Sequence, residues 1–175
     1  MLVREYTTKW VHDFQIIKTI LNEALQHLPL TIEHIGSTSI PGLAAKPIID
    51  IDIVYENNVS FIEIKNRLER IGYYHNGNQG ITDRDVFKRK NVATKHPVLD
   101  SIAHHLYVCP AHSEELKRHL LFRNYLRINE NARNEYQKLK LALAAKAQQD
   151  KKRYAVLKEE NAGEFIEKIL SMENS

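Results

Sequence analysis

The segment that most constrains the fold of this chain is IIDIDIVY, residues 48–55, which directly follows a proline. Successive side chains of a β-strand point to opposite faces, so the isoleucines at odd positions share one face and Asp50 and Asp52 share the other. The pattern therefore predicts a strand that is anchored through its isoleucines and carries two carboxylates side by side on the opposite face.

The other segments predict helices around a small sheet. Helical spacing of apolar residues, and short apolar runs bounded by Gly, Pro, Asn or Asp, indicate the elements. Helices are predicted at residues 9–28 and 59–71, strands at 31–35, 85–89 and 102–108, and helices again from 113, with breaks near 129–131 and 161–163. This order predicts an α+β fold with a small mixed sheet flanked by helices. We expect residues 1–110 to form this core and residues 111–175 to form a C-terminal helical segment packed on it, in a single compact domain.

Composition and charge exclude several classes of protein. The 175 residues are 43% hydrophobic and 27% charged, and no apolar run approaches the roughly 20 residues that span a bilayer. The first residues lack the apolar stretch of a signal peptide, and the lone Cys109 cannot form an internal disulfide. We therefore expect a cytoplasmic protein with no membrane partner. The net charge of +3 argues against an extended nucleic-acid footprint, and no sequence signal indicates an oligomeric state.

The pair of aspartates is a candidate metal site. Two hard carboxylate ligands at adjacent positions on one strand face suit Mg²⁺ or Mn²⁺. Without a cation the two charges repel each other, and one carboxyl tends to stay protonated. An edge strand with a polar, wet face explains the same alternation, so Asp50 and Asp52 alone do not decide between the two interpretations.

A Gly-Ser-Thr turn at residues 36–38 precedes the aspartate strand. Gly36 allows its backbone to approach a ligand closely, and Ser37 and Thr38 offer hydroxyl and backbone N–H groups that can hold a phosphate. Ser and Thr are also typical of an ordinary helix N-cap, so the turn by itself is weak evidence for a phosphate site.

Together the turn and the strand resemble a known superfamily. A Gly-Ser turn followed, 13 residues after Ser37, by an Asp-x-Asp strand is similar to the motif of the nucleotidyltransferase superfamily typified by DNA polymerase beta. In that superfamily the serine side of the motif holds the triphosphate and the carboxylates hold divalent metal, which stabilises charge during in-line displacement. The resemblance implies these roles for Ser37, Asp50 and Asp52.

A closer resemblance is to the GrpB family, a largely uncharacterised group with a nucleotidyltransferase-like fold. It is carried by HIGSTSIPGLAAKPIIDIDI at residues 34–53 and by the histidine-containing strand AHHLYV at residues 103–108. Three later segments are similar to the family's helical motifs: LFRNYLR at residues 121–127, Tyr136 to Lys140, and Tyr154 to Lys158. The resemblance extends over roughly residues 9–170, in the same order.

Two departures bear on the expected chemistry: the lack of a third carboxylate, and Tyr107, where the GrpB family pattern more often has a second histidine. A typical polymerase-beta-like site has a third carboxylate on a later strand, and the strand with His105 and Tyr107 has none. We expect these two side chains to share one face and line the cleft. Imidazole is a softer ligand than Mg²⁺ prefers, which leaves Mn²⁺, Zn²⁺ or a single ion as alternatives. Asp83, Asp85 and Asp100 are carboxylates that nearby loops could supply instead.

Cationic side chains downstream are candidates for phosphate binding. Arg123 and Arg127 lie four residues apart, as do Tyr136 and Lys140, and each pair shares one helical face. A third pair, Tyr154 and Lys158, completes a set that could form a cationic wall over the carboxylate strand. Ion pairing along helix faces with nearby glutamates, such as residues 114, 115, 130 and 135, explains the same spacing.

These observations lead to a specific functional hypothesis. We expect a metal-dependent, nucleotidyltransferase-like enzyme that uses Mg²⁺ or Mn²⁺ and a nucleoside triphosphate, with Asp50, Asp52 and His105 as catalytic residues and Asp50 and Asp52 as metal ligands. The expected phosphate-binding residues are Gly36, Ser37, Thr38, Lys46, Arg123, Lys140 and Lys158. A small molecule, a protein side chain or an RNA end could be the acceptor. The alternatives are a nucleotide- or RNA-binding module with little or no catalysis, and a scaffold whose C-terminal helices contact a partner.

Overall fold

The computed structural model describes residues 1–89 and 94–173, which form one five-stranded sheet and six α-helices. The strands are β1 (Leu30–Ile35), β2 (Ile49–Tyr55), β3 (Tyr73–His75), β4 (Asp85–Arg89) and β5 (His104–Pro110). The helices are α1 (Lys9–Ala24), α2 (Phe61–Arg70), α3 (Pro97–Ser101), α4 (Glu114–Ile128), α5 (Glu130–Lys146) and α6 (Lys151–Glu173), with a short 3₁₀ helix, η1 (Ser37–Ser39).

The sheet is mixed, as the order of elements predicts. Its strand order is β1-β2-β5-β4-β3, with β2 parallel to β5 and every other neighbouring pair antiparallel. The parallel register places Asp50 opposite His105 and Asp52 opposite Tyr107. The residues that sequence analysis singled out on two separate strands are therefore neighbours on the sheet.

One face of the sheet is packed against α1 and α2. The isoleucines of β2 at positions 49, 51 and 53 are at most 1% exposed and belong to the largest core cluster, together with Trp10 and Phe14 of α1 and Leu68 of α2. A fully buried side chain of this kind contributes about 1.5–3 kcal/mol through the hydrophobic effect. Since this face is apolar, the aspartates of β2 lie on the other face, as alternation predicts.

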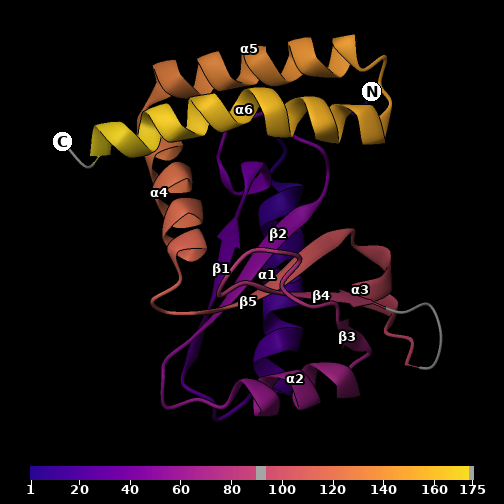
Figure 1. Ribbon diagram of the computed structural model, residues 1–175. Helices are drawn as coiled ribbons and strands as arrows, with labels where there is room; N and C mark the ends of the chain where they lie inside the picture. The colour runs from indigo at the N-terminus through magenta and orange to yellow at the C-terminus, as the bar shows by residue number, and fades with distance from the viewer. Residues whose placement is uncertain (90–93, 174–175) are drawn as a thin grey trace.

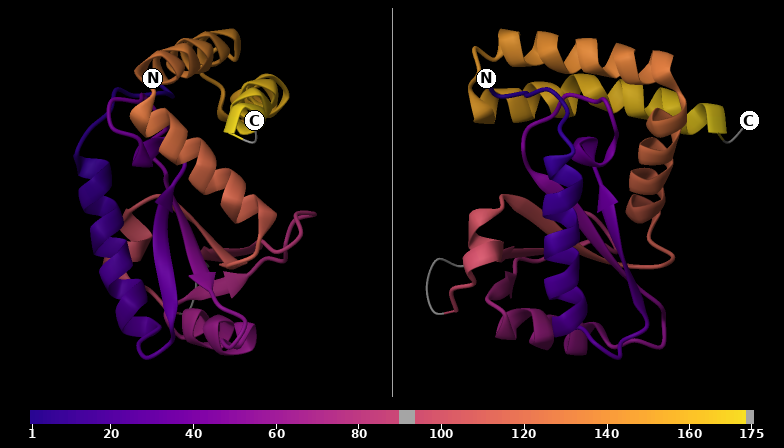
Figure 2. Two further views of the ribbon diagram at one scale, coloured as in Figure 1. Left: turned by 90° about the vertical axis from the view of Figure 1, so that its left-hand side faces the viewer. Right: turned by 180° about the vertical axis from the view of Figure 1, so that it is seen from behind.

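The C-terminal helices lie on the aspartate side and beyond one end of the strands. Figure 2 (left) shows α1 and α4 on opposite sides of the sheet, and Figure 1 shows α5 and α6 side by side above it. Two smaller apolar clusters join these helices to the rest, one around Leu2 and Leu143 and the other around Leu43 and Tyr136. None of the helices in the described part of the chain is long and apolar enough to cross a membrane.

Several element boundaries differ from the prediction. The short elements β3 and α3 were not predicted, and α1 ends at Ala24 rather than at residue 28. The break expected near residues 161–163 is absent, because α6 continues through Gly163 and packs along α5. The break lies instead at residues 147–150, where Gln148 and Gln149 adopt positive φ angles. Glutamine is not typical of turns, so the sequence pattern did not predict the break at residues 147–150.

Candidate functional site

The two aspartates of β2 differ strongly in exposure. The side chain of Asp50 is 27% exposed and lines a cleft, whereas the side chain of Asp52 is completely buried. Each accepts a hydrogen bond from a histidine on a different element. His105 Nδ1 of β5 donates to Asp50 Oδ1 over 2.8 Å, and His119 Nδ1 of α4 donates to Asp52 Oδ2 over 2.8 Å.

The Gly-Ser turn lies directly against Asp50. Gly36 has a φ of +69°, and a Cβ atom built on it would lie 2.3 Å from Asp50 Oδ2. Only glycine therefore allows this turn to meet the carboxylate without a shift of one of them. The adjoining Thr38 hydroxyl is already engaged, since it donates to the carbonyl of Ile48 and contacts His34 Nε2.

A cleft of two adjoining lobes opens over this turn and the ends of β2 and β5. The larger lobe has a volume of about 640 Å³ and the smaller about 260 Å³, and both are lined by Ser37, Asp50 and Lys158. Most of the expected site residues meet here. Those that line the larger lobe are Ser37, Thr38, Lys46, Asp50, His105, Lys140 and Lys158, while Gly36 lines the smaller one.

Three lysines from separate parts of the chain face the larger lobe. Lys140 of α5 is only 1% exposed, and its Nζ has no hydrogen-bond partner among the described residues. Burial, reinforced by the charge of Lys158, lowers the pKa of Lys140 to about 7. Burial and Lys158 also lower the pKa of Lys46, whose ammonium lies 4.6 Å from the ring centroid of Tyr154. The lining of the lobe therefore combines three lysines with three carboxylates, those of Asp50, Glu115 and Glu159.

Beneath the cleft, Asp52 is the buried end of a chain of charges that continues through the partly exposed His119 and Glu115. The His119 Nε2 atom also lies 3.3 Å from Glu115 Oε1, one helical turn away on α4. Burial by itself would lower the pKa of His119, but its hydrogen bonds to both carboxylates raise it to about 9. Burial raises the pKa of Asp52, and the His119 bond opposes that shift. The second oxygen, Asp52 Oδ1, has no hydrogen-bond partner among the described residues.

The later strand supplies an imidazole and a phenol where a third carboxylate would be expected. His105 and Tyr107 both line the larger lobe, as their two-residue spacing predicts. The Arg84 guanidinium lies 4.9 Å from the ring centroid of Tyr107, and burial raises the pKa of that phenol. Asp85 and Asp100 do not reach the cleft, since they pair instead with His75 and Arg89.

Two expected site residues lie outside the cleft lining. Asp52 lies beneath the cleft, and Arg123 connects α4 to β1 through hydrogen bonds. The Arg123 guanidinium donates to Glu33 Oε2 over 2.7 Å and to the carbonyl of His34 over 2.9 Å. Its partner is therefore a glutamate of a distant strand, not one of the helix-face glutamates considered from the sequence.

His119 and Glu115 were not predicted as site residues, although both line the smaller lobe. The only local signal is their spacing of four residues, which places them on one helical face. The partner of His119 is 67 residues away in the sequence, so nothing local in the sequence indicates this pair.

The carboxylates fit one hard divalent cation better than two. Asp52 Oδ1 is a buried acceptor without a partner, and Asp50 lies two residues away on the same strand face. Among residues 1–89 and 94–173, however, no group of three or more His, Cys, Asp or Glu side chains is arranged to hold a metal ion. A cation here would need further oxygen ligands from a bound phosphate or from water.

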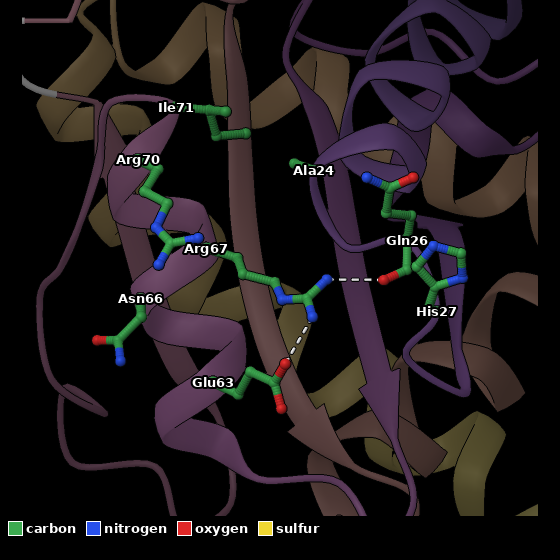
Figure 3. A pocket seen from close by; sticks show the side chains of 8 residues that line it. All are labelled: Ala24, Gln26, His27, Glu63, Asn66, Arg67, Arg70 and Ile71. Atoms are coloured by element: carbon green, nitrogen blue, oxygen red, sulfur yellow. Dashed lines mark hydrogen bonds and ion pairs between the residues drawn. The ribbon is translucent and has the colours of Figure 1, made fainter.

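A second cavity, with a volume of about 500 Å³, lies beside α2 (Figure 3). Helix α2 itself lies at the opposite end of the molecule from α5 and α6 (Figure 1). None of the residues predicted for the site lines this cavity. Its central cation, Arg67, points toward Glu63 and the backbone carbonyl of Gln26, and hydrogen-bonds to both.

Comparison with known proteins relates the whole chain to one family. The sequence model of the family described as "GrpB protein" matches residues 1–171. The UPF0157 protein YqkA of Bacillus subtilis is 35% identical over 80% of this chain, and the match spans 38% of that relative's length.

Solved structures agree with this relationship and with the fold. The crystal structure of the conserved protein GrpB from Enterococcus faecalis has a TM-score of 0.78, 33% identity and 99% coverage of both chains. The Cid1 poly(U) polymerase bound to MgGTP has a TM-score of 0.58 and 15% identity, over 83% of this chain and 45% of that one. At this identity the second match indicates a shared nucleotidyltransferase-like fold alone.

Proposed function

The chain belongs to the GrpB family, and from this premise we propose that it is a metal-dependent, nucleotidyltransferase-like enzyme that transfers a nucleotidyl group from a nucleoside triphosphate to an acceptor. The support comes from the site, since the fold alone does not carry an activity. The two lobes of the cleft bring together the accessible carboxylate of Asp50, the Gly-Ser turn and three lysines, with Glu115 and Glu159 also in the lining.

The observation that carries the proposal is the buried ammonium group of Lys140, which lies 5.1 Å from the ring centroid of Tyr136 and has no hydrogen-bond partner among the described residues. A buried charge without a partner is unfavourable for the fold, and such groups are concentrated at functional sites. An anionic ligand in the larger lobe would supply the missing partner, and Lys46 and Lys158 line the same lobe. A triphosphate has the charge to engage all three lysines at once.

Each residue of the cleft has a defined part in this proposal. Ser37 and the backbone of the turn hold phosphate oxygens, and the lysines neutralise the triphosphate charge. One divalent cation, Mg²⁺ or Mn²⁺, held by Asp50 and Asp52, would supply the charge stabilisation that phosphoryl chemistry requires. His105 stays oriented by its bond to Asp50 and faces the lobe where the phosphates are bound.

The direct test is calorimetric titration with ATP, GTP, CTP and UTP, each with Mg²⁺, with Mn²⁺ and with EDTA. We expect metal-dependent binding of at least one nucleotide, and loss of that dependence in Asp50→Asn. The matched control is Asp85→Asn, because Asp85 also accepts a hydrogen bond from a histidine on the same sheet but does not line the cleft. Binding that is equal in both variants would refute the proposed metal site.

A second candidate function is a nucleotide-binding module without catalysis. Tyr107 lies opposite Asp52 on the neighbouring strand, and Asp52 is already engaged by His119. These contacts favour a site with fewer metal ligands than a transferase of this fold uses. Under this alternative the titration would detect a nucleotide, but incubation with candidate acceptors would release no pyrophosphate.

A further inference from the structure

Helix α6 forms one wall of the larger lobe and has a glycine in its middle. Gly163 lines this lobe, together with Lys158 earlier on the helix and Ile166 one turn later. Glycine is among the least favourable residues in a helix interior, since it loses the most backbone freedom on folding. Its presence here calls for a local reason.

The two usual structural reasons for a glycine are absent at this position. Gly163 does not have a positive φ angle, and a Cβ atom built on it would meet no described atom within 4 Å apart from its chain neighbours and the adjacent backbone of its own helix. Gly36 is the opposite case, because it has a positive φ and its Cβ would collide with Asp50. The protein itself therefore leaves room for a side chain at Gly163, and that room is part of the cleft.

The surroundings of Gly163 differ from those of the lysines. Ile81, Tyr107 and Ile166 line the larger lobe with it, so the lining contains a flat ring and aliphatic side chains as well as the cationic residues. A nucleotide carries both of the matching chemistries, namely charged phosphates and a flat, weakly polar base. Lys140, whose buried ammonium has no hydrogen-bond partner among the described residues, independently favours an anionic ligand in this same lobe.

We propose that the nucleobase of the bound nucleotide lies against the backbone of α6 at Gly163, and that Gly163 sets the steric limit on the base at this wall. The inference rests on the proposed function, since it assumes that the phosphates occupy the lysine-lined part of the lobe. It identifies Gly163 as a specificity-determining residue, a role that no charge or hydrogen-bonding group would reveal.

The test enlarges residue 163 and compares two probes, a nucleoside triphosphate and inorganic tripolyphosphate, each with Mg²⁺. Gly163→Leu is expected to weaken binding of the nucleotide by about tenfold or more, because the side chain fills the space of the base. Binding of tripolyphosphate, which lacks a base, should be unchanged. Gly163→Ala should raise Tm by about 2–4 °C through its better helix propensity, which shows that the helix tolerates a side chain there.

The matched control is Glu160→Leu, which places the same side chain on an exposed position of α6 outside the cleft lining. This variant should bind both probes like the wild type. Nucleotide binding by Gly163→Leu at wild-type affinity, or an equal loss for tripolyphosphate, would overturn the inference. If the wild type binds tripolyphosphate but no nucleotide, the lobe excludes a base and the inference is wrong. If it binds neither probe, the proposed function itself fails.

Discussion

Two cavities of similar size lie at different places on this molecule, and among the residues that the structure describes, a buried cation without a hydrogen-bond partner lines only one of the two. The larger lobe of the cleft measures about 640 Å³ and the cavity beside α2, shown in Figure 3, about 500 Å³. Both are lined by basic and acidic side chains. Volume and composition therefore do not separate them.

The pairing of the charges does separate them. Beside α2, Arg67 is held by Glu63 and by the carbonyl of Gln26, and Arg70 is exposed to solvent. In the cleft, Lys140 is buried, and none of the residues that the structure describes forms a hydrogen bond with its ammonium group. A cation that is paired or solvated contributes to the fold and needs no ligand, whereas a buried, unpartnered cation is stabilised once an anion binds.

The largest expected effect tests the buried pair under the cleft against the exposed pair beside α2. His119→Ala removes the partner of the fully buried Asp52, and we expect it to lower the free energy of unfolding by about 3–5 kcal/mol at pH 8. Glu63→Ala breaks an exposed pair and should cost about 0–1 kcal/mol. Urea denaturation measures both. Equal losses of stability in the two variants would contradict the distinction between the buried Asp52–His119 pair and the exposed Glu63–Arg67 pair.

The next effect concerns Lys140, where we expect a substitution to increase the free energy of unfolding rather than decrease it. Lys140→Met removes an unpartnered buried charge, so at pH 6 it should raise the free energy of unfolding by about 1–4 kcal/mol while abolishing binding of tripolyphosphate. The pKa of Lys140 is about 7 in the folded protein and 10.5 in its ordinary state. The unfolded chain therefore binds more protons between these values, and the Lys140 contribution to stability rises with pH through this window.

Lys140→Met should remove the increase in stability that the titration of Lys140 produces as the pH rises above about 7. Below pH 7 both states of the wild type are protonated at Lys140, so the unfavourable contribution is fully present there. Urea titrations at pH 6 and pH 9 on both proteins measure the difference. A gain from the substitution that is as large at pH 9 as at pH 6 would contradict the assignment of a buried, unpartnered ammonium group.

The smallest effect is expected at the cavity beside α2. Arg67→Met removes hydrogen bonds to Gln26 and Glu63 and should cost about 1 kcal/mol of stability. Nucleotide affinity should not change, because this cavity lies apart from the cleft. Thermal unfolding and calorimetric titration check the two parts, and Arg70→Met, at an exposed arginine of the same cavity, is the control. A loss of nucleotide affinity in Arg67→Met would assign a ligand to this cavity.

Local patterns predicted much of the fold because they reflect interactions between near neighbours. The alternation around Asp50 and Asp52 predicted β2 and its two faces, and the strand with His105 was predicted as well. The boundaries of α6 were wrong, since packing against α5 keeps Gly163 helical in spite of its low propensity.

The candidate site was only partly predictable, for a reason that β2 illustrates. Alternation assigns Asp50 and Asp52 to the same face, but it does not determine what covers each of them. Helix α4 covers Asp52 and supplies His119, whereas Asp50 stays open to the cleft. Arg123 was assigned to phosphate binding from its spacing and family resemblance, while its actual partner is Glu33 of β1.

The sequence by itself determined the strand with its two carboxylates, the Gly-Ser turn, the α+β class and the family. Each of these depends on residues close together in the chain or on a motif in linear order. Only the tertiary structure decided that Asp52 is buried against His119, that Lys140 has no hydrogen-bond partner in the described part of the chain, and that Gly163 lines the cleft. Burial and pairing depend on segments brought together from distant parts of the chain, and local periodicity carries no information about them.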